Sequence, residues 1–348
     1  MNEAAADPHA LDADRLIPWL RANLPDAQGA IGWSKFAVGQ SNPTYVITID
    51  GMARYVLRKK PPGALLPSAH AIEREYRVTA ALADTAVPVA RPRALCEDPA
   101  LIGTSFYVMD HVAGRHFRDA AMQGASPGER ASLYDAMNSA LATLHQVDVA
   151  AVGLADFGRP TGYFARQIAR WTRQYRATET VRIEAMERLI AWLPAHDRPE
   201  DDEARIVHGD YRIDNLIFAA DEPRVAAILD WELATIGHPL ADLAGHMIAW
   251  RLPAEGFKGL AGLDLPALGI PGETEYIAAY CARTRRPPIE PERWRFAVAF
   301  ALFRNACIRQ GVLRRALDGN ASNTIAREAG ERAAAVAGIG WRTACGEV

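Results

Sequence analysis

The spacing of apolar side chains predicts a helix followed by a strand-rich region. Residues 11–24 carry apolar positions near helical spacing, at Leu11, Leu16, Trp19, Leu20 and Leu24. From about residue 33 to 109, apolar and polar residues alternate in runs of strand length, and Asp50-Gly51 between two runs predicts a hairpin turn. Helical spacing returns over 69–83, so this region is expected to contain strands and one helix.

Beyond residue 112 the pattern is mostly helical. Long amphipathic stretches predict helices at 127–147, 162–193, 240–250, 273–284 and 291–317. An island at 206–230 alternates short apolar runs with polar turns, as small hairpins do, while 251–272 is predicted to be a loop and the tail beyond 320 is only weakly helical. We therefore predict an α+β protein with an N-terminal docking helix (1–30), a small β-rich lobe (31–110) and a larger, mostly α-helical lobe (111–348).

Composition narrows the class of protein. The 348 residues include 39 basic and 42 acidic side chains, a net charge of -3, and 49% are hydrophobic, which excludes a disordered chain and gives no electrostatic reason to expect nucleic acid or a membrane as partner. The four cysteines are far apart and form no C-x-x-C pair, and the acidic N-terminus has no secretory signal pattern. A cytoplasmic location is expected; the oligomeric state is left open.

The most specific motif in the chain is His208-Gly209-Asp210-Tyr211-Arg212-Ile213-Asp214-Asn215, followed by Asp230-Trp231-Glu232. Asn215 comes five residues after Asp210, and Asp230 comes fifteen residues after Asn215. Taken singly, such residues commonly serve only local turns. Taken together, they resemble the catalytic loop and metal-binding motif of the aminoglycoside phosphotransferase and choline kinase branch of the protein-kinase-like fold.

This resemblance implies a bilobal fold, a set of residue roles and two cofactors. Asp210 is expected to be the catalytic base that accepts the proton of an acceptor hydroxyl, and Asn215 and Asp230 are expected to bind the Mg²⁺ that bridges the ATP phosphates. His208 is expected to hold the loop backbone rather than to act as a catalyst. Asp242 matches a helix-start carboxylate thought to brace the loop, although it also fits an ordinary first-turn aspartate.

The resemblance also places ATP in the β-rich lobe. Strand alternation puts Arg54, Val56 and Arg58 on one face and Tyr55, Leu57 and Lys59 on the other. Arg58 takes the place of the phosphate-pairing lysine of kinases, with Lys59 as the alternative, and Glu75 on the following helix is expected to orient it.

Two further segments complete the expected nucleotide site. Ser41 and Asn42, in Gly39-Gln40-Ser41-Asn42, occupy the place of the phosphate-covering loop, although this loop has one glycine where protein kinases have three. The strand Phe106–Met109 leads into Asp110-His111-Val112, where backbone groups of Asp110 and Val112 are expected to contact the adenine edge.

Within this superfamily, the chain is most similar to phosphotransferase-like proteins that stand alone in bacteria or precede some acyl-CoA dehydrogenases. The motifs that carry this similarity are Gly39–Asn42, Val56–Gly63, Leu66–His70 and Asp230–Glu232. It implies a hydroxylated small-molecule acceptor, for which a CoA thioester is a candidate. Residues 251–348 hold 14 basic and 10 acidic side chains, which favours an anionic acceptor; the arginines concerned are Arg283, Arg285, Arg286, Arg304, Arg309, Arg314 and Arg315.

Three alternatives differ from this reading in acceptor or in chemistry. An aminoglycoside antibiotic phosphotransferase would need an acidic acceptor pocket for its cationic substrate. A catalytically degenerate nucleotide-binding protein would explain Arg58 in place of lysine, but the intact Asp210, Asn215 and Asp230 argue against it. A protein kinase is disfavoured, because no A-P-E segment follows Asp230-Trp231-Glu232.

Overall fold

The computed structural model describes residues 11–36, 42–61, 71–198, 203–318 and 324–347, and it divides the chain into two compact units. The first unit extends to Gly114 and also includes Ala226–Glu232. The second unit contains Arg115–Val225 and Leu233–Val348. The short segment that carries Asp230 therefore belongs to the first unit, although it lies more than a hundred residues further along the chain.

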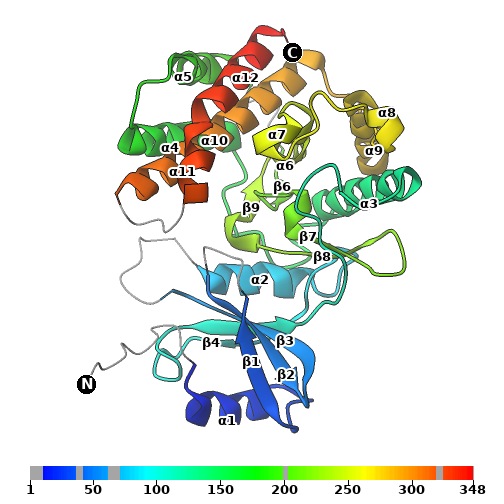
Figure 1. Cartoon of the computed structure of the whole chain (residues 1–348), viewed down its shortest axis with the longest axis vertical. Helices are drawn as coiled ribbons and strands as arrows, with labels where there is room; N and C mark the ends of the chain where they lie inside the picture. Colours follow the sequence, from blue (N-terminus) through cyan, green and yellow to red (C-terminus); the bar gives the residue numbers. More distant parts are fainter. Residues whose placement is uncertain (1–10, 37–41, 62–70, 199–202, 319–323, 348) are drawn as a thin grey trace. The chain divides into compact units, whose positions relative to one another are not determined.

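The first unit is built on a five-stranded antiparallel sheet (Figure 1). Asp50 and Gly51 both have positive φ angles, 50° and 78°, and form the predicted turn between the second and third strands, because two consecutive left-handed residues match the twist of a hairpin. The strands in spatial order are β1 (Ile31–Lys35), β2 (Thr44–Ile49), β3 (Met52–Lys59), β5 (Phe106–Asp110) and β4 (Pro92–Cys96).

The two faces of this sheet pack against different helices (Figure 1). Helix α1 (Ala13–Asn23) buries Leu16 and Leu20 against Ile47, Leu57 and Val108 of the sheet, forming the core of the unit. Helix α2 (Ile72–Leu82) packs against β4 and β5. Since side chains alternate along β3, the face that carries Arg58 is the face of α2.

The second unit is mainly helical and is organised around α10 (Pro291–Leu317). This helix is long and apolar enough to cross a membrane, but 72% of its apolar window is buried inside the protein, as in the core helix of a globular domain. It packs against α4 (Tyr163–Thr178), α5 (Glu184–His196), α6 (Pro239–Met247), α11 (Thr324–Glu331) and α12 (Ala333–Cys345). Helices α3 (Pro127–His145) and α9 (Glu273–Thr284) pack against each other.

The structure corrects three sequence-based expectations in this unit. The stretch 162–193 is two helices, α4 and α5, because the chain is extended around Glu179 and Ile183. The predicted loop at 251–272 contains two four-residue helices, α7 (Ala254–Phe257) and α8 (Leu265–Leu268). The tail beyond residue 320, whose helical pattern is weak, packs firmly against the unit: α12 contacts α10 and α5, and its Val336 and Ala337 are completely buried.

Short strands flank the loops that contain the motif residues. Strands β6 (Arg205–Val207) and β9 (Thr235–Gly237) pair in antiparallel fashion on either side of the motif. Strands β7 (Leu216–Phe218) and β8 (Val225–Ile228) lie between them in sequence and are linked by a turn that the Ala219 N–H closes by donating to the Arg224 carbonyl. The predicted island of short hairpin strands is confirmed.

Candidate active site

In the first unit, Arg58 is the centre of a charged cluster on the α2 face of the sheet. Its Nε lies 2.8 Å from Glu75 Oε2, and its Nη2 donates to Asp230 Oδ1 at 2.6 Å. Glu232 Oε2 lies 4.0 Å from the same nitrogen. Burial acts to lower the pKa of Arg58, but the carboxylates of Glu75 and Asp230 outweigh it and raise this pKa above its ordinary value. The predicted pairing of Arg58 with Glu75 is confirmed.

Glu75 is held by neutral donors as well as by Arg58. Asn42 Nδ2 donates to Glu75 Oε1 at 2.9 Å, and the Tyr107 hydroxyl donates to Oε2 at 3.2 Å. Burial is the largest influence on Glu75 and raises its pKa, while Arg58 acts to lower it. The carboxylate is only 1% exposed, so these donors supply the polar contacts that water would otherwise make.

The remaining predicted nucleotide residues have different surroundings. Asn42 is buried, and its carboxamide acts on Glu75; contact with a nucleotide remains a prediction. Ser41 lies outside the described residues. The Asp110 side chain accepts two hydrogen bonds from Arg93, at 2.7 Å each, and its N–H donates to the Arg91 carbonyl.

Val112 differs from Asp110 at the backbone. It follows β5, and its N–H makes no hydrogen bond to any residue of the described ranges. This free donor is what adenine contact at Val112 requires, whereas the N–H of Asp110 is already used in the sheet. The adenine contact itself remains a prediction.

Lys59, the alternative to Arg58, lies on the opposite face of the sheet. It is 2% exposed, and its Nζ donates to the carbonyl of Ile102 at 3.4 Å. Ile102 belongs to the apolar core that also contains Leu16 and Leu20 of α1. Lys60 pairs with Glu73 at 2.5 Å. Of the three consecutive cations, Arg58 alone is directed at Glu75 and Asp230.

Asp230 has a backbone conformation that few aspartates adopt. Its φ angle is +63°, in the left-handed region, and the following Trp231 indole donates to the Ile228 carbonyl at 2.9 Å, which anchors the segment. Such strain persists only where surrounding contacts impose it and is common at functional sites. The carboxylate is one-third exposed, so it is accessible while it binds Arg58.

In the second unit, Asp242 clamps the loop that carries Asp210. Its two carboxylate oxygens accept from the N–H groups of His208, at 2.5 Å, and Gly209, at 2.7 Å. Gly209 has a φ of +83°, and a Cβ there would lie 2.6 Å from the Leu233 carbonyl oxygen, so only glycine fits. His208 Nδ1 accepts from the Asp210 N–H at 3.2 Å. The predicted bracing role of Asp242 and the backbone role of His208 are confirmed.

A buried chain of hydrogen bonds stands behind Asp242. His145 Nε2 lies 3.3 Å from Asp242 Oδ2, and His145 Nδ1 lies 2.7 Å from the Tyr280 hydroxyl. Burial acts to raise the pKa of Asp242, but the hydrogen bonds from His145 and the Gly209 N–H outweigh it and hold this pKa below its usual value. Asp242 therefore remains ionised and can hold the loop at neutral pH.

The Asp210 carboxylate contacts two motif residues. Asn215 Nδ2 donates to Asp210 Oδ2 and to the Asp210 carbonyl, at 2.9 Å each, and Arg212 Nε lies 3.6 Å from Oδ2. Arg212 Nη2 also donates to Asp214 at 2.5 Å. These contacts fix the direction of the Asp210 carboxylate without burying it, since 39% of its side chain stays exposed.

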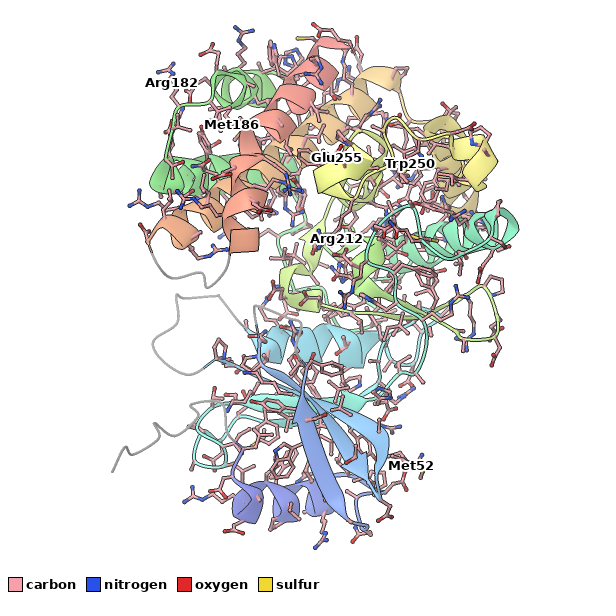
Figure 2. The ribbon with its side chains drawn as sticks, in the orientation of Figure 1. Met52, Arg182, Met186, Arg212, Trp250 and Glu255 are labelled. Carbon is pink, nitrogen blue, oxygen red and sulfur yellow. The ribbon has the colours of Figure 1, made fainter. Side chains whose placement is uncertain are left out.

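Asp210 lines a cavity of the second unit that holds about 750 Å³ of space open to solvent. Figure 2 labels two of its lining residues, Arg212 from the loop that carries Asp210 and Trp250 after α6, and also Glu255 on α7. Its charged lining residues are four basic and three acidic, namely Arg118, Arg212, Lys258 and Arg309, and Asp119, Asp210 and Asp214. His246 lines it as well, and burial lowers the pKa of His246 to about 3, so this ring is neutral.

Most of these cavity cations were not among the arginines expected at the acceptor. Of those arginines, Arg309 lines the cavity, and Arg304 donates to the Gly209 carbonyl and lines a second pocket beside Asp210. Arg283 pairs with Asp135 at 2.6 Å and Arg286 with Glu203 at 2.8 Å. Arg118 and Lys258 carried no sequence signal, because they lie in irregular segments far apart in the chain.

The donor atoms present suit Mg²⁺ that arrives with a nucleotide. Within the described ranges no group of three or more His, Cys, Asp or Glu residues could hold a metal by itself. Mg²⁺ is commonly bound through one or two protein oxygens together with substrate phosphates and water. Asn215 uses its Nδ2 on Asp210, which leaves Oδ1 as an oxygen donor, and Asp230 supplies a carboxylate.

The fold and these clusters define a class, the kinase-like small-molecule phosphotransferases. Two solved structures share the fold at low identity: choline kinase from Cryptosporidium parvum (12% identical, TM-score 0.62, covering 94% of this chain and 95% of that one) and aminoglycoside phosphotransferase APH(4)-Ia in complex with AMP-PNP and hygromycin B (14%, 0.61, 96% and 100%).

More similar proteins and a family model narrow the class. Residues 32–295 match the phosphotransferase enzyme family, and the chain belongs to this family. A crystal structure from Ralstonia eutropha JMP134, provisionally assigned to the aminoglycoside phosphotransferases, is 47% identical with a TM-score of 0.88 and covers 97% of this chain and 99% of that chain.

Two curated relatives are much longer than this chain. Acyl-CoA dehydrogenase family member 10 of Mus musculus is 44% identical over 335 residues, 95% of this chain and 31% of that protein. Human family member 11 is 41% identical over 319 residues, 90% of this chain and 41% of that protein. The chain thus spans less than half of the length of either.

Proposed function

We propose that the protein transfers the γ-phosphate of ATP, with Mg²⁺, to a hydroxyl of a negatively charged metabolite, a hydroxyacyl-CoA being the leading candidate. The observation that carries the proposal is the Asp210 carboxylate, clamped through the backbone by Asp242, directed by Asn215 and open to a solvent-accessible cavity. A carboxylate in this setting is suited to positioning a hydroxyl and accepting its proton.

The proposed reaction needs no reactant besides ATP and the acceptor. The acceptor hydroxyl lies against Asp210 and gives its proton to this carboxylate while its oxygen forms a bond to the γ-phosphorus. The bond between that phosphorus and the β–γ bridging oxygen breaks, and ADP leaves. Asn215 and Asp230 would hold Mg²⁺, which would supply positive charge to the phosphates. Arg58, oriented by Glu75, would pair with the phosphates.

Several observations support the finer parts of this proposal. ATP as donor is supported by relatives of the same fold whose structures contain AMP-PNP or ADP. An acyl-CoA acceptor is supported by the names of the 41–44% identical relatives and by the basic residues of the cavity. We also propose a cytoplasmic location, with which the four free cysteines agree.

A screen for ADP release tests the function. The full chain is incubated with ATP and Mg²⁺ and with hydroxyacyl-CoA esters, aminoglycosides, choline or homoserine, each against a reaction without acceptor. We expect stimulation by at least one hydroxyacyl-CoA. Efficient phosphorylation of kanamycin-type compounds and of no CoA ester would replace the acceptor by an antibiotic, and no ADP release with any hydroxyl compound would favour a nucleotide-binding protein without transfer activity.

A further inference from the structure

Basic side chains from separate segments gather at the cavity that contains Asp210. Arg118 precedes α3, Lys258 follows α7, and Arg309 lies on α10. Arg118 and Lys258 are exposed, and neither makes an ion pair with any residue that the structure describes. Ion pairs are the usual fate of surface arginines, and Arg212 in the same wall shows it by binding Asp214. Unneutralised cations that line a concave surface indicate an anionic ligand.

The backbone holds Arg118 and Lys258 on adjacent segments. The Ala120 N–H donates to the Lys258 carbonyl at 3.3 Å, which joins the segment after Arg118 to the loop after α7. Lys258 has a φ of +59°, in the left-handed region that lysine seldom adopts. At the next residue, Gly259, a Cβ would lie 1.9 Å from the Leu252 carbonyl oxygen. The loop path is therefore fixed by close backbone packing, and strain of this kind is typical of binding loops.

Phe257 lies against the guanidinium groups of Arg309 and of one further arginine, Arg332. The Cζ atoms of Arg309 and Arg332 lie 5.3 Å and 5.7 Å from the centre of its ring. Burial lowers the pKa of Arg309, and the like charges of Arg332 and Arg212 lower it further. The like charges of these arginines repel each other, and an anion bound beside them would reduce that repulsion.

We propose that Arg118, Lys258 and Arg309, with Arg332 beside them, bind the phosphate groups of the acceptor. The ligand class is a thioester or ester on a carrier that bears a diphosphate, with its hydroxylated end at Asp210. Three carboxylates, Asp119, Asp210 and Asp214, also line the cavity and oppose the binding of anions, but Arg212 pairs with Asp214 and Asp210, whereas Arg118 and Lys258 make no ion pair with any described residue. This inference rests on the proposed function, since it names the part of the acceptor that the protein recognises.

Binding of coenzyme A to the full chain tests the subsite, measured by calorimetry with saturating AMP-PNP and Mg²⁺ so that the nucleotide site is filled. The double variant Arg118→Gln, Lys258→Asn removes two exposed charges, and asparagine tolerates the left-handed backbone at 258. The matched control is Arg173→Gln, Lys35→Asn, which removes one exposed arginine and one exposed lysine that do not line the cavity.

We expect the first variant to raise the Kd of coenzyme A by about tenfold or more, which corresponds to about 1.4 kcal/mol, and to reduce its dependence on salt. The control variant should leave both unchanged, and pantetheine, which lacks the phosphates, should bind equally to all three proteins. Inorganic pyrophosphate should compete with coenzyme A if the phosphates alone are recognised. The KM for ATP should not change.

An unchanged Kd for coenzyme A, or an equal increase in the control variant, would overturn the subsite. Displacement of coenzyme A by AMP-PNP would overturn it too, because the molecule would then bind at the nucleotide site. These outcomes are separate from failure of the proposed function. If an uncharged alcohol is phosphorylated and the changes at Arg118 and Lys258 have no effect, the proposed kinase activity stands and the phosphate subsite is wrong. If coenzyme A binds at these residues but no ADP is released with any acceptor, the subsite stands and the proposed kinase activity is wrong.

Discussion

The Asp210 carboxylate combines a fixed direction with exposure to solvent, because Asn215 and Arg212 contact it from its own loop while Asp242 holds the backbone beneath. Asp210→Asn keeps the size and most hydrogen bonds of this side chain but removes its capacity to accept a proton. We expect turnover to fall about 10²- to 10⁴-fold, with the affinity for ATP nearly unchanged. Steady-state kinetics and nucleotide calorimetry measure the two quantities.

Asp221→Asn is the matched control for this prediction, because Asp221 is an exposed aspartate in the turn after β7. It should leave turnover unchanged. Activity of Asp210→Asn close to that of the unaltered protein would remove Asp210 from the role of base.

Asp230 offers a second test at the level of one residue. Its φ of +63° would add strain to an alanine variant, so Asp230→Asn is the better change, since asparagine accepts left-handed geometry. Loss of the carboxylate should remove the Mg²⁺-dependent part of nucleotide affinity, which is measured by titrating ADP with and without Mg²⁺. If Mg²⁺ still strengthens binding to the same extent, Asp230 only supports Arg58.

A site residue could be predicted from the sequence when it lies in a contiguous motif, and could not when only tertiary contacts bring it to the site. Asp210, Asn215 and Asp242 lie in one motif and the helix that follows it, so the resemblance of this short segment to a known family was enough to predict their roles. Arg118 and Lys258 are brought together by a backbone hydrogen bond between irregular segments, which no periodicity reports. Asn42 was expected in the phosphate-covering loop; the contact of its buried carboxamide with Glu75 could not be predicted, since tertiary packing decides where a loop side chain points.

At the scale of elements, alternation along β3 decided between Arg58 and Lys59. The two consecutive cations face opposite sides of the sheet, so α2 with Glu75 selects Arg58, and Lys59 is buried near Ile102. Periodicity predicted this alternation correctly. It failed at the tail, because α12 is short and rich in alanine and glycine, and its packing against α10 depends on close contact rather than on a strong amphipathic pattern.

The docking of α12 gives a prediction about stability. Val336 is fully buried on this helix, and Val336→Ala should lower the free energy of unfolding by about 2 kcal/mol, through lost apolar burial and a residual cavity. Denaturant unfolding measures the change. Val181→Ala is the control, since Val181 is 62% exposed and should alter the free energy of unfolding little. Equal effects of the two changes would mean that α12 contributes nothing to the folded unit.

At the scale of the whole molecule, the motif residues are shared between two compact units. Arg58, Glu75 and Asp230 belong to the first unit, because Ala226–Glu232 joins it, while Asp210 and Asn215 belong to the second. The whole motif was expected in the lobe of residues 111–348, because chain order alone does not show that residues 226–232 belong to the first unit. The two proposed Mg²⁺ ligands thus come from different units of the chain.

The stability of the whole protein toward acid should depend on His246. Burial lowers its pKa to about 3 in the folded state, against about 6.5 when unfolded, so between these values the unfolded chain binds a proton that the folded protein does not. Stability is therefore lost as the pH falls. From pH 6.5 to 4.5 this loss is about 2 to 3 kcal/mol, at about 1.4 kcal/mol per pH unit.

Guanidinium unfolding at pH 6.5 and 4.5 measures this loss, with His246→Phe as the variant and His196→Gln, at an exposed histidine, as the control. Phenylalanine suits the surrounding rings of Tyr211, Trp250 and Tyr276 and has no proton to bind. The variant should lose less free energy of unfolding over this interval than the unaltered protein, and the control should lose the same amount. Asp242 titrates below this interval, and Glu75, whose raised pKa acts in the opposite direction, is present in all three proteins, so its contribution cancels. An equal acid dependence in His246→Phe and the unaltered protein would mean that His246 is protonated in the folded state as readily as in the unfolded chain.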